Sequence, residues 1–399
     1  MQNCKNYCQD YWNKIIKTET QEDKTLIGLP FPYLTPNQHM FQEMYYWDTY
    51  FMCLGILGTK HEELIISCTE NLLYLQRRFG RIPNSSRYYH LSRSQPPVLA
   101  LMVDLCYNLK LKIKANALGW LEQVYPVVVS EYEMVWNGTK FPDYRYIGEV
   151  GLSRYFDIDI WHHSAEAESG WDMTPRFGNH CLNYCPVDLN CLLYNYSENL
   201  GLFANLLNRK DDLEHWQRES ARRKQAIFKY CKAENGFYYD YDFVNHRQSL
   251  FMTVAGFFVL WSGILEAQEA AYLIDKFLPD FEKDYGIVTT EFWEPELGEE
   301  GKQWAWPNGW APLQWIVIKG LLNYGSENEA RRIAQKWTKL VSDIFEMEGC
   351  NFEKYNVVDG QRAVPDRYPD QSGFGWTNAI FVRLVDFLET GALKDGPTR

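Results

Sequence analysis

Two carboxyl groups stand in irregular, aromatic-rich stretches of the sequence, where they could carry out acid and base chemistry. The first is Asp172 in GWDMTPRF, with Gly170 two residues before it and Trp171 and Met173 beside it. An Asp enclosed by aromatic and apolar groups loses solvation of its charged form, so its pKa rises. A carboxylic acid that stays protonated near neutral pH can donate a proton to a departing oxygen. Taken alone, such an Asp is more often a helix N-cap or a turn residue.

The second carboxyl group is Glu353 in NFEKYN. Its neighbours Phe352 and Tyr355 are aromatic, Lys354 is basic, and the segment does not follow the pattern of a charged helix face. A carboxylate in this setting could act as a general base that activates water. By itself the motif fits equally a surface Glu paired with a lysine.

Aromatic residues, 16% of the chain, concentrate in clusters beside polar residues. The segment QWAWPNGWAPLQW (303–315) holds four Trp, and EMYYWDTYF (43–51) and FGWTN (374–378) are similarly dense. A large aromatic core explains most of these residues, but clusters in several loops also suit stacking against sugar rings, with polar neighbours binding hydroxyls. The candidate sugar contacts are Tyr45, Trp47, Asp48, Asn84, Arg93, Gln95, Gly170, Trp171, Trp304, Trp306, Trp310 and Trp376.

The elements that must position these residues are helices, because the apolar residues follow mainly helical periodicity. Helices are predicted at 3–18, 43–57, 62–79, 94–108, 115–135, 186–207, 211–233, 250–264, 266–278, 308–323, 327–347 and 374–391. They come in pairs, an apolar helix followed by an amphipathic one, which indicates buried and water-facing partners. Six such pairs predict an all-α fold, an (α/α)6 toroid, in which the first helix closes the outer ring against the last.

Long irregular segments separate the predicted helices at 25–42, 80–93, 137–184, 279–307 and 348–373. Long loops in a compact domain are usually functional, and these five hold nearly all the unusual residues. No linker or change in composition divides the chain, so residues 1–399 are predicted to form a single catalytic domain.

Composition excludes several classes of function. The net charge of −12 and the pI of about 5.3 argue against binding to nucleic acid or anionic membrane, and no apolar run is long enough to span a bilayer. The ten cysteines are scattered, without metal-ligand spacing, and the first residues do not resemble a secretory signal. We therefore expect a cytoplasmic protein with reduced thiols, no metal and no cofactor, acting on a small molecule as a monomer or weak homo-oligomer.

The motifs resemble those of trehalases, glycoside hydrolase family 37, and the matches are collinear from about residue 30 to residue 385. FQEMYYWDTYF and QWAWPNGWAPLQW resemble the two family signatures; RIPNSSRYYHLSRSQPP, LSRYFD, ESGWD and CPVDLN lie between them, and EKYN and SGFGWTN follow. The resemblance implies an (α/α)6 fold and hydrolysis with inversion at the anomeric carbon. It implies Asp172 as general acid, Glu353 as general base, and a sugar contact from Phe41 besides several of those given above.

The sequence departs from the family pattern at three contacts. Met40 stands where the first signature has Arg, Ala305 where the second has Asp, and Arg367 where the family has a Glu. Trehalose is the default substrate, and poorer cleavage of trehalose is expected if these losses are not compensated.

Two alternatives remain open on the sequence alone. In the first, a small polyol or acid replaces the second sugar, as in compact family 63 hydrolases of mannosylglycerate or glucosylglycerate; Arg367 and His162 or His163 would then meet the carboxylate of an acidic aglycone. In the second, the toroid binds sugar without catalysis, which the presence of both carboxyl groups argues against.

Overall fold

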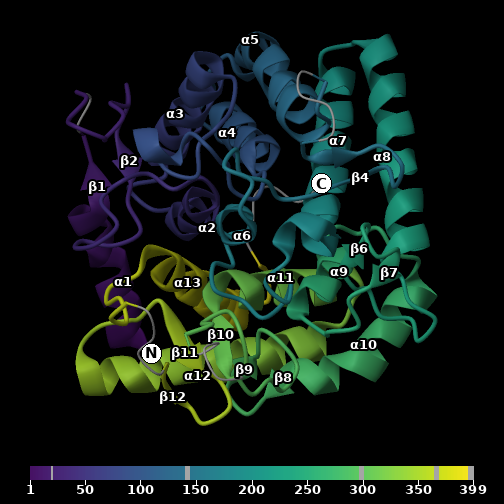
Figure 1. Ribbon diagram of the computed structural model, residues 1–399. Coiled ribbons are helices and arrows are strands. Elements are labelled where there is room, and N and C mark those ends of the chain that lie inside the picture. Colours follow the sequence, from purple (N-terminus) through teal and green to yellow (C-terminus); the bar gives the residue numbers. More distant parts are fainter. Residues whose placement is uncertain (19–20, 140–143, 296–300, 364–367, 394–399) are drawn as a thin grey trace.

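The computed structural model describes residues 1–18, 21–139, 144–295, 301–363 and 368–393, and within them the chain is mainly helical (Figure 1). The helices are α1 (Gln2–Ile15), α2 (Tyr46–Ile56), α3 (Leu64–Phe79), α4 (Leu99–Lys112), α5 (Ala117–Ser130), α6 (His162–Glu168), α7 (Val187–Leu206), α8 (Lys210–Tyr230), α9 (Phe258–Trp261), α10 (Ala267–Phe281), α11 (Ala311–Asn323), α12 (Glu327–Glu348) and α13 (Gly375–Thr390).

An inner ring of helices forms the core. In sequence these helices are apolar on all sides, and the structure buries them accordingly: every residue of α2 is buried, as are most of α11 and α13. Around the ring, α2 packs on α13, α13 on α11, α11 on α9, α9 on α7 and α7 on α4. The Tyr46 hydroxyl at the start of α2 accepts hydrogen bonds from the backbone N–H groups of Val98 and Leu99 (3.1 and 2.8 Å), which closes the ring at α4.

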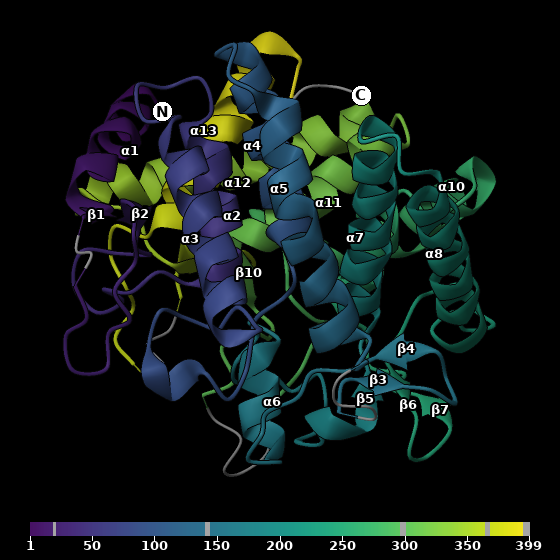
Figure 2. The ribbon, with the colours of Figure 1, turned by 90° about the horizontal axis from the view of Figure 1, so that it is seen from above.

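The outer helices are amphipathic and cover the inner ones. Examples are α8 on α7 and α12 on α11 and α13, and α1 lies beside α13 (Figures 1 and 2). The predicted toroid is thus confirmed, including the closure of the outer ring by the first helix. Across the described residues, every helix falls short of the length and apolarity that a bilayer crossing requires.

Short antiparallel strands join the loops at the ends of the helices. They are β1 (Ile16–Lys17), β2 (Tyr33–Leu34), β3 (Tyr146–Ile147), β4 (Leu152–Ser153), β5 (Tyr184–Cys185), β6 (Tyr241–Asp242), β7 (Arg247–Gln248), β8 (Glu282–Lys283), β9 (Gly286–Ile287), β10 (Asn308–Trp310), β11 (Lys354–Asn356) and β12 (Gln361–Arg362). Figure 2 shows β3 to β7 and α6 gathered at one side of the helices. The β10–β11 pair, with Trp310 opposite Lys354, brings the tryptophan-rich segment against the segment that carries Glu353.

Three details of the predicted helices were wrong. The helix predicted from residue 308 begins at Ala311, because Asn308–Trp310 pairs with β11 instead. The helix predicted at 250–264 is only a 3₁₀ turn, Val254–Phe257, followed by α9, because Thr253 is extended and bridges Thr290. Helix α6 was not predicted at all; at seven residues it is too short for a clear periodic signal.

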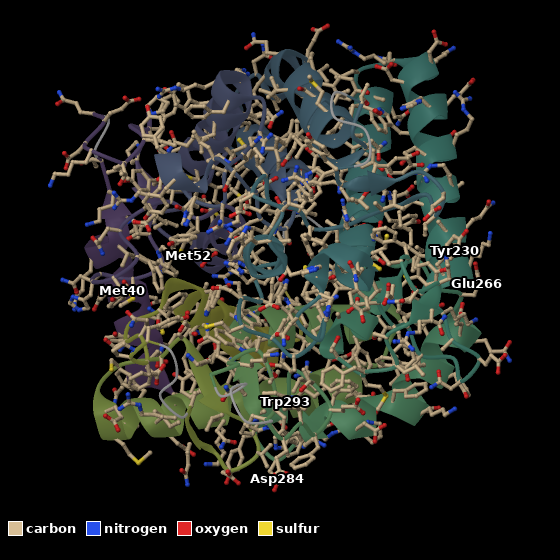
Figure 3. The ribbon with its side chains drawn as sticks, viewed as in Figure 1. Met40, Met52, Tyr230, Glu266, Asp284 and Trp293 are labelled. Atoms are coloured by element: carbon tan, nitrogen blue, oxygen red, sulfur yellow. The ribbon has the colours of Figure 1, made fainter. Side chains whose placement is uncertain are left out.

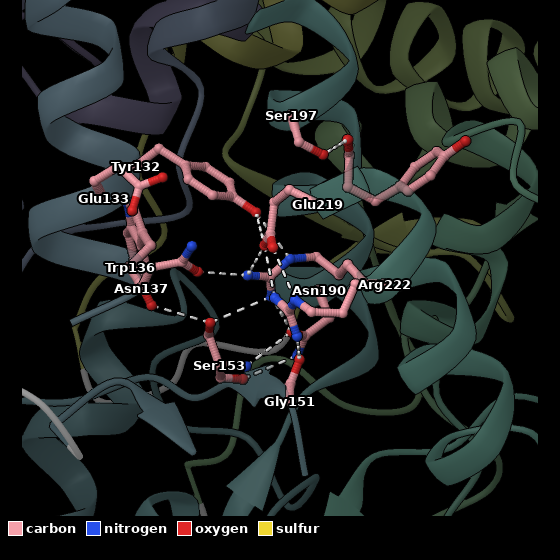
Figure 4. A network of polar contacts seen from close by, with 12 residues as sticks. Tyr132, Glu133, Trp136, Asn137, Gly151, Ser153, Asn190, Ser197, Glu219 and Arg222 are labelled. Carbon is pink, nitrogen blue, oxygen red and sulfur yellow. Dashed lines mark hydrogen bonds and ion pairs between the residues drawn. The ribbon is translucent and has the colours of Figure 1, made fainter. Parts of the chain in front are cut away.

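A buried arginine connects α8 to the beginning of the long segment 137–184, which carries Asp172. The Arg223 guanidinium donates to Asn190 of α7 (2.8 Å), to Asn137 (2.9 Å) and to Ser153 of β4 (3.3 Å). Glu219 supplies the opposite charge and also pairs with Arg222 (Figure 4). Truncating one member of a buried, charged network typically lowers the free energy of unfolding by about 3–5 kcal/mol. This network therefore holds the start of the segment in place.

Candidate active site

A cleft of about 390 Å³ opens where the loops of the toroid converge. Four of the five predicted irregular segments contribute residues to its wall. The remaining segment, 80–93, ends just before Gln95, which also lines the cleft. The other lining residues lie at the start of α2 and α13. The lining residues are Pro36, Phe41, Tyr45, Trp47, Asp48, Gln95, Gly170, Asp172, Trp304, Glu353, Tyr368, Phe374 and Trp376. Both predicted catalytic carboxyl groups are therefore in one cleft with eight of the predicted contact residues.

Glu353 lies at a buried position in this wall, with 3% of its surface exposed. Its backbone is fixed on both sides: its N–H donates to the Gln371 carbonyl (3.0 Å), and its carbonyl accepts from the Trp376 indole (3.0 Å). The carboxylate accepts hydrogen bonds from the Tyr368 hydroxyl (3.0 Å to Oε1) and from the Lys354 ammonium (3.4 Å to Oε2). The side chain is consequently held in one orientation at the cleft surface.

Burial raises the pKa of Glu353 to about 7, although Lys354 and the Tyr368 hydroxyl favour its ionised form. The carboxyl groups of Asp370 and Asp172 act in the same direction as burial, because like charges disfavour ionisation. A base whose pKa lies close to neutral pH is well matched to accepting a proton from water near that pH.

Asp172 follows α6 in a tightly turned loop. Gly170 has φ +72°, and a Cβ atom there would lie 2.7 Å from the Trp47 ring, so this position requires glycine. The expectation that Trp171 and Met173 enclose the Asp172 side chain is wrong: Trp171 is fully buried beneath the loop, whereas Asp172 is exposed to the cleft. This carboxyl group is therefore placed where a ligand in the cleft can contact it.

A second carboxylate, Glu166 of α6, fixes the loop directly after Asp172. Its Oε1 accepts hydrogen bonds from the N–H groups of Met173 (2.8 Å) and Thr174 (3.1 Å). Glu166 is buried, and burial raises its pKa to about 7. The loop is also tied to the tryptophan-rich segment, since the Trp304 N–H donates to the Met173 carbonyl (3.2 Å) and the Thr174 hydroxyl donates to the Trp304 carbonyl (3.0 Å).

Asp48 at the start of α2 is a third acid in the wall. Burial raises its pKa well above the usual range, and the charges of Glu353 and Asp172 add to the shift, while a hydrogen bond from Gln95 opposes it. Gln95 is itself oriented by the Trp47 N–H, which donates to its Oε1 (3.0 Å). The neutral form of the carboxyl group, which this environment favours, can donate a hydrogen bond to a ligand hydroxyl as well as accept one.

Tryptophans form the apolar part of the wall. Trp304 faces the cleft and stacks on Trp310 with ring centroids 3.7 Å apart, and Trp171 stacks on it less closely at 5.6 Å. The Arg176 guanidinium lies 4.6 Å from the Trp171 ring and is held by ion pairs to buried carboxylates of α7 and the β6 segment. Trp171 and Trp310 were predicted to contact sugar, but both are fully buried and neither lines the cleft; each stacks on Trp304, which does line it.

Three further predicted contacts do not line the cleft. The Asn84 amide donates to the carbonyls of Ser94 (3.0 Å) and Ala167 (3.2 Å), so it supports the loop before Asp172. Arg93 pairs with buried Asp157 (2.9 Å). Trp306 packs against exposed Phe292, away from the wall.

Arg367 lies outside the described residues. His162 and His163 also lie away from the lining residues, in the first turn of α6.

Several wall residues were missed by sequence reasoning. Tyr368 contacts the carboxylate of Glu353 directly, and Gln303 and Lys354 lie behind it with 1% exposure each. Pro36 and Phe374 complete the wall. Lys354 stands next to Glu353 and Phe374 is the first residue of FGWTN, so both could have been included from the sequence. Nothing in the local pattern distinguishes Tyr368 among the 27 tyrosines.

Comparison with known proteins decides the family. The trehalase family matches residues 1–155 and 144–389 of this sequence. The chain belongs to the trehalase family. The resemblance drawn from the motifs is thereby confirmed, and the protein is a glycoside hydrolase for which an inverting mechanism is consistent with the family.

Solved structures of the same architecture support the fold. Neutral trehalase Nth1 from Saccharomyces cerevisiae has a TM-score of 0.79 at 24% identity, over 97% of this chain and 80% of that one. The GH63 mannosylglycerate hydrolase from Thermus thermophilus in complex with glucose has a TM-score of 0.71 at 19% identity, over 95% and 99% of the two chains. At these identities the likeness shows a shared fold between this trehalase-family chain and both enzymes.

Two of the three departures from the family pattern, Met40 and Ala305, lie off the described cleft wall. Met40 is 48% exposed and lies toward the periphery of the molecule (Figure 3). Ala305 is fully buried between Trp304 and Trp306. In this chain neither position contributes a side chain to the described cleft wall.

Proposed function

We propose that this trehalase-family enzyme hydrolyses an α-glucosidic bond with inversion, with Asp172 as general acid, Glu353 as general base and trehalose as the default substrate. Asp172 protonates the glycosidic oxygen as its bond to C1 breaks. Glu353 takes a proton from the water that attacks C1 from the opposite face, which releases a β-anomer. The acid ends ionised and the base ends protonated, and both exchange protons with solvent.

The observation that carries the proposal is the contrast between the two carboxyl groups. Glu353 is buried, ordered by Tyr368 and Lys354, and has a pKa of about 7. Asp172 stands on a separate loop and is exposed to the cleft. A sugar that fills the cleft would contact Asp172 directly, which is the position that a proton donor needs.

The wall supports a neutral substrate. The described lining residues include three carboxyl groups, those of Asp48, Asp172 and Glu353, and no Lys, Arg or His. A carboxylate on the aglycone would be repelled by those that are ionised, so trehalose or a glycerol glycoside is favoured over a glycerate glycoside. Arg367, which could reverse this preference, can be tested by substitution.

The remaining expectations are part of the same proposal. Residues 1–399 form one catalytic domain, and the enzyme acts as a monomer or weak homo-oligomer. A cytoplasmic location is supported by ten free cysteines, nine of them buried. Mass measurement in solution and cell fractionation test these points.

The proposal is tested with a panel of trehalose, glucosylglycerol, glucosylglycerate and mannosylglycerate, assayed with wild type and the Arg367→Ala variant. We expect cleavage of trehalose and weaker cleavage of both glycerates. If a glycerate glycoside is preferred in wild type and the preference disappears in Arg367→Ala, the family 63 alternative replaces trehalose. Sugar binding without release of any product would identify a non-catalytic binder.

A further inference from the structure

Glu353 and three supporting side chains, from three separate segments in all, form a closed ring of polar contacts. Lys354 contacts Gln303 Oε1 at 2.9 Å, Gln303 Nε2 contacts the Tyr368 hydroxyl at 3.0 Å, and that hydroxyl contacts Glu353 at 3.0 and 3.2 Å. Lys354 closes the ring at 3.4 Å from Glu353 Oε2. Gln303 and Lys354 are almost fully buried, and Tyr368 alone of the three supporting side chains reaches the cleft.

The direction of every hydrogen bond in this ring is fixed. An ammonium can only donate, so Gln303 must present its carbonyl oxygen to Lys354 and its amide N–H to Tyr368. The Tyr368 oxygen accepts from that amide, which leaves its O–H free to donate to Glu353. An ionised carboxylate accepts such a bond, and a hydrogen bond to the charged form favours that form.

The other groups that face Glu353 act mostly against ionisation. Asp370 is close to Tyr368 in the chain, Asp172 comes from the loop after α6, and Asp48 comes from α2; all three are acidic. Among the described residues, the cation against Glu353 is Lys354 on β11, which also lies 5.2 Å from the Tyr368 ring. The ionised base therefore depends on Lys354 and on the Tyr368 hydroxyl.

We propose that Tyr368 is a positioning residue for hydrolysis: its hydroxyl, oriented by Gln303, keeps the Glu353 carboxylate ionised and directed at the attacking water. This inference rests on the proposed role of Glu353 as base. Gln303 has a role in the same arrangement. It accepts from Lys354 and donates to the Tyr368 oxygen, so the Tyr368 O–H is directed at Glu353.

The test is Tyr368→Phe, which removes the hydroxyl and keeps the ring against Lys354 and Phe41. Loss of one hydrogen bond to a charged group should move the acidic limb of the kcat/KM profile upward by about one pH unit. On the alkaline side of this limb, kcat/KM should recover to within a few fold of wild type. Gln303→Leu should shift the limb in the same direction by less, because Tyr368 remains but loses its orientation.

The control is Tyr238→Phe, which removes a tyrosine–glutamate hydrogen bond of 2.7 Å outside the cleft and should leave the limb in place. Titration of the Glu353 carboxyl by carbon-13 NMR, assigned by its loss in Glu353→Gln, gives the same readout without substrate. A Tyr368→Phe enzyme with lower activity at every pH, and with an unmoved carboxyl titration, would overturn the inference. Unimpaired turnover in Glu353→Gln would instead defeat the proposed function.

Discussion

Replacing Glu353 by Gln should make the protein more stable at alkaline pH while it removes the catalytic base. The folded-state pKa of Glu353 is about 7, against an ordinary value of 4.5. Because the pKa is raised on folding, the folded state binds more protons between these values, and stability falls as pH rises through this window. At about 1.4 kcal/mol for each pH unit, the ionised carboxylate costs the wild type roughly 3 kcal/mol above pH 7.

Gln carries no such cost, but it has only one acceptor oxygen where Lys354 and the Tyr368 hydroxyl both donate, which offsets part of the gain. Urea unfolding at about pH 5 and about pH 8.5 measures the effect as the change in free energy of unfolding. The variant should gain on wild type by roughly 2–3 kcal/mol between the two pH values. The control Glu214→Gln, on an exposed face of α8, should show no gain. An equal difference from wild type at both pH values would refute the reasoning about this buried charge.

Three further predictions concern catalysis. Asp172→Asn and Glu353→Gln should each lower kcat by at least about a hundredfold, measured as glucose release, and near-wild-type turnover would remove the assignment of that residue. Glu166→Ala should lower kcat more than Glu166→Gln, because Gln keeps an oxygen for the two N–H groups after Asp172; equal effects would argue against this clamp. Because the sequence predicts hydrolysis without a metal, activity should survive exhaustive EDTA treatment, and a loss restored by added metal would contradict it.

The helical architecture was predictable because its signal is repeated along the chain. Twelve predicted helices correspond to helical segments of the structure. Helical spacing of apolar residues is recognisable when it is repeated over ten or more residues. The short strands and α6 were not predictable in the same way. Two or three residues carry no periodicity, and β10 exists only because β11, more than 40 residues later, pairs with it.

At the site, the sequence indicated which loops carry the cleft residues better than it indicated which side chains of those loops line the cleft. Trp304, Trp310 and Trp171 have the same residue type and similar neighbours, yet of the three only Trp304 lines the cleft, whereas Trp310 and Trp171 each stack on it and are fully buried. Asp172 was expected to be buried by its sequence neighbours, but the turn at Gly170 directs the loop so that Trp171 is buried and Asp172 is exposed. Such outcomes depend on contacts between distant segments.

The central claim is inversion at the anomeric carbon by Asp172 and Glu353, and proton NMR of the first products tests it most directly. An inverting enzyme acting on trehalose releases β-glucose from the attacked sugar and α-glucose from the leaving sugar, so both anomers should appear in equal amounts before mutarotation. A retaining enzyme would release α-glucose alone and would require a covalent intermediate. Early spectra with β- and α-glucose in equal amounts are predicted; early spectra with α-glucose only would contradict the pairing of Asp172 as acid with Glu353 as base.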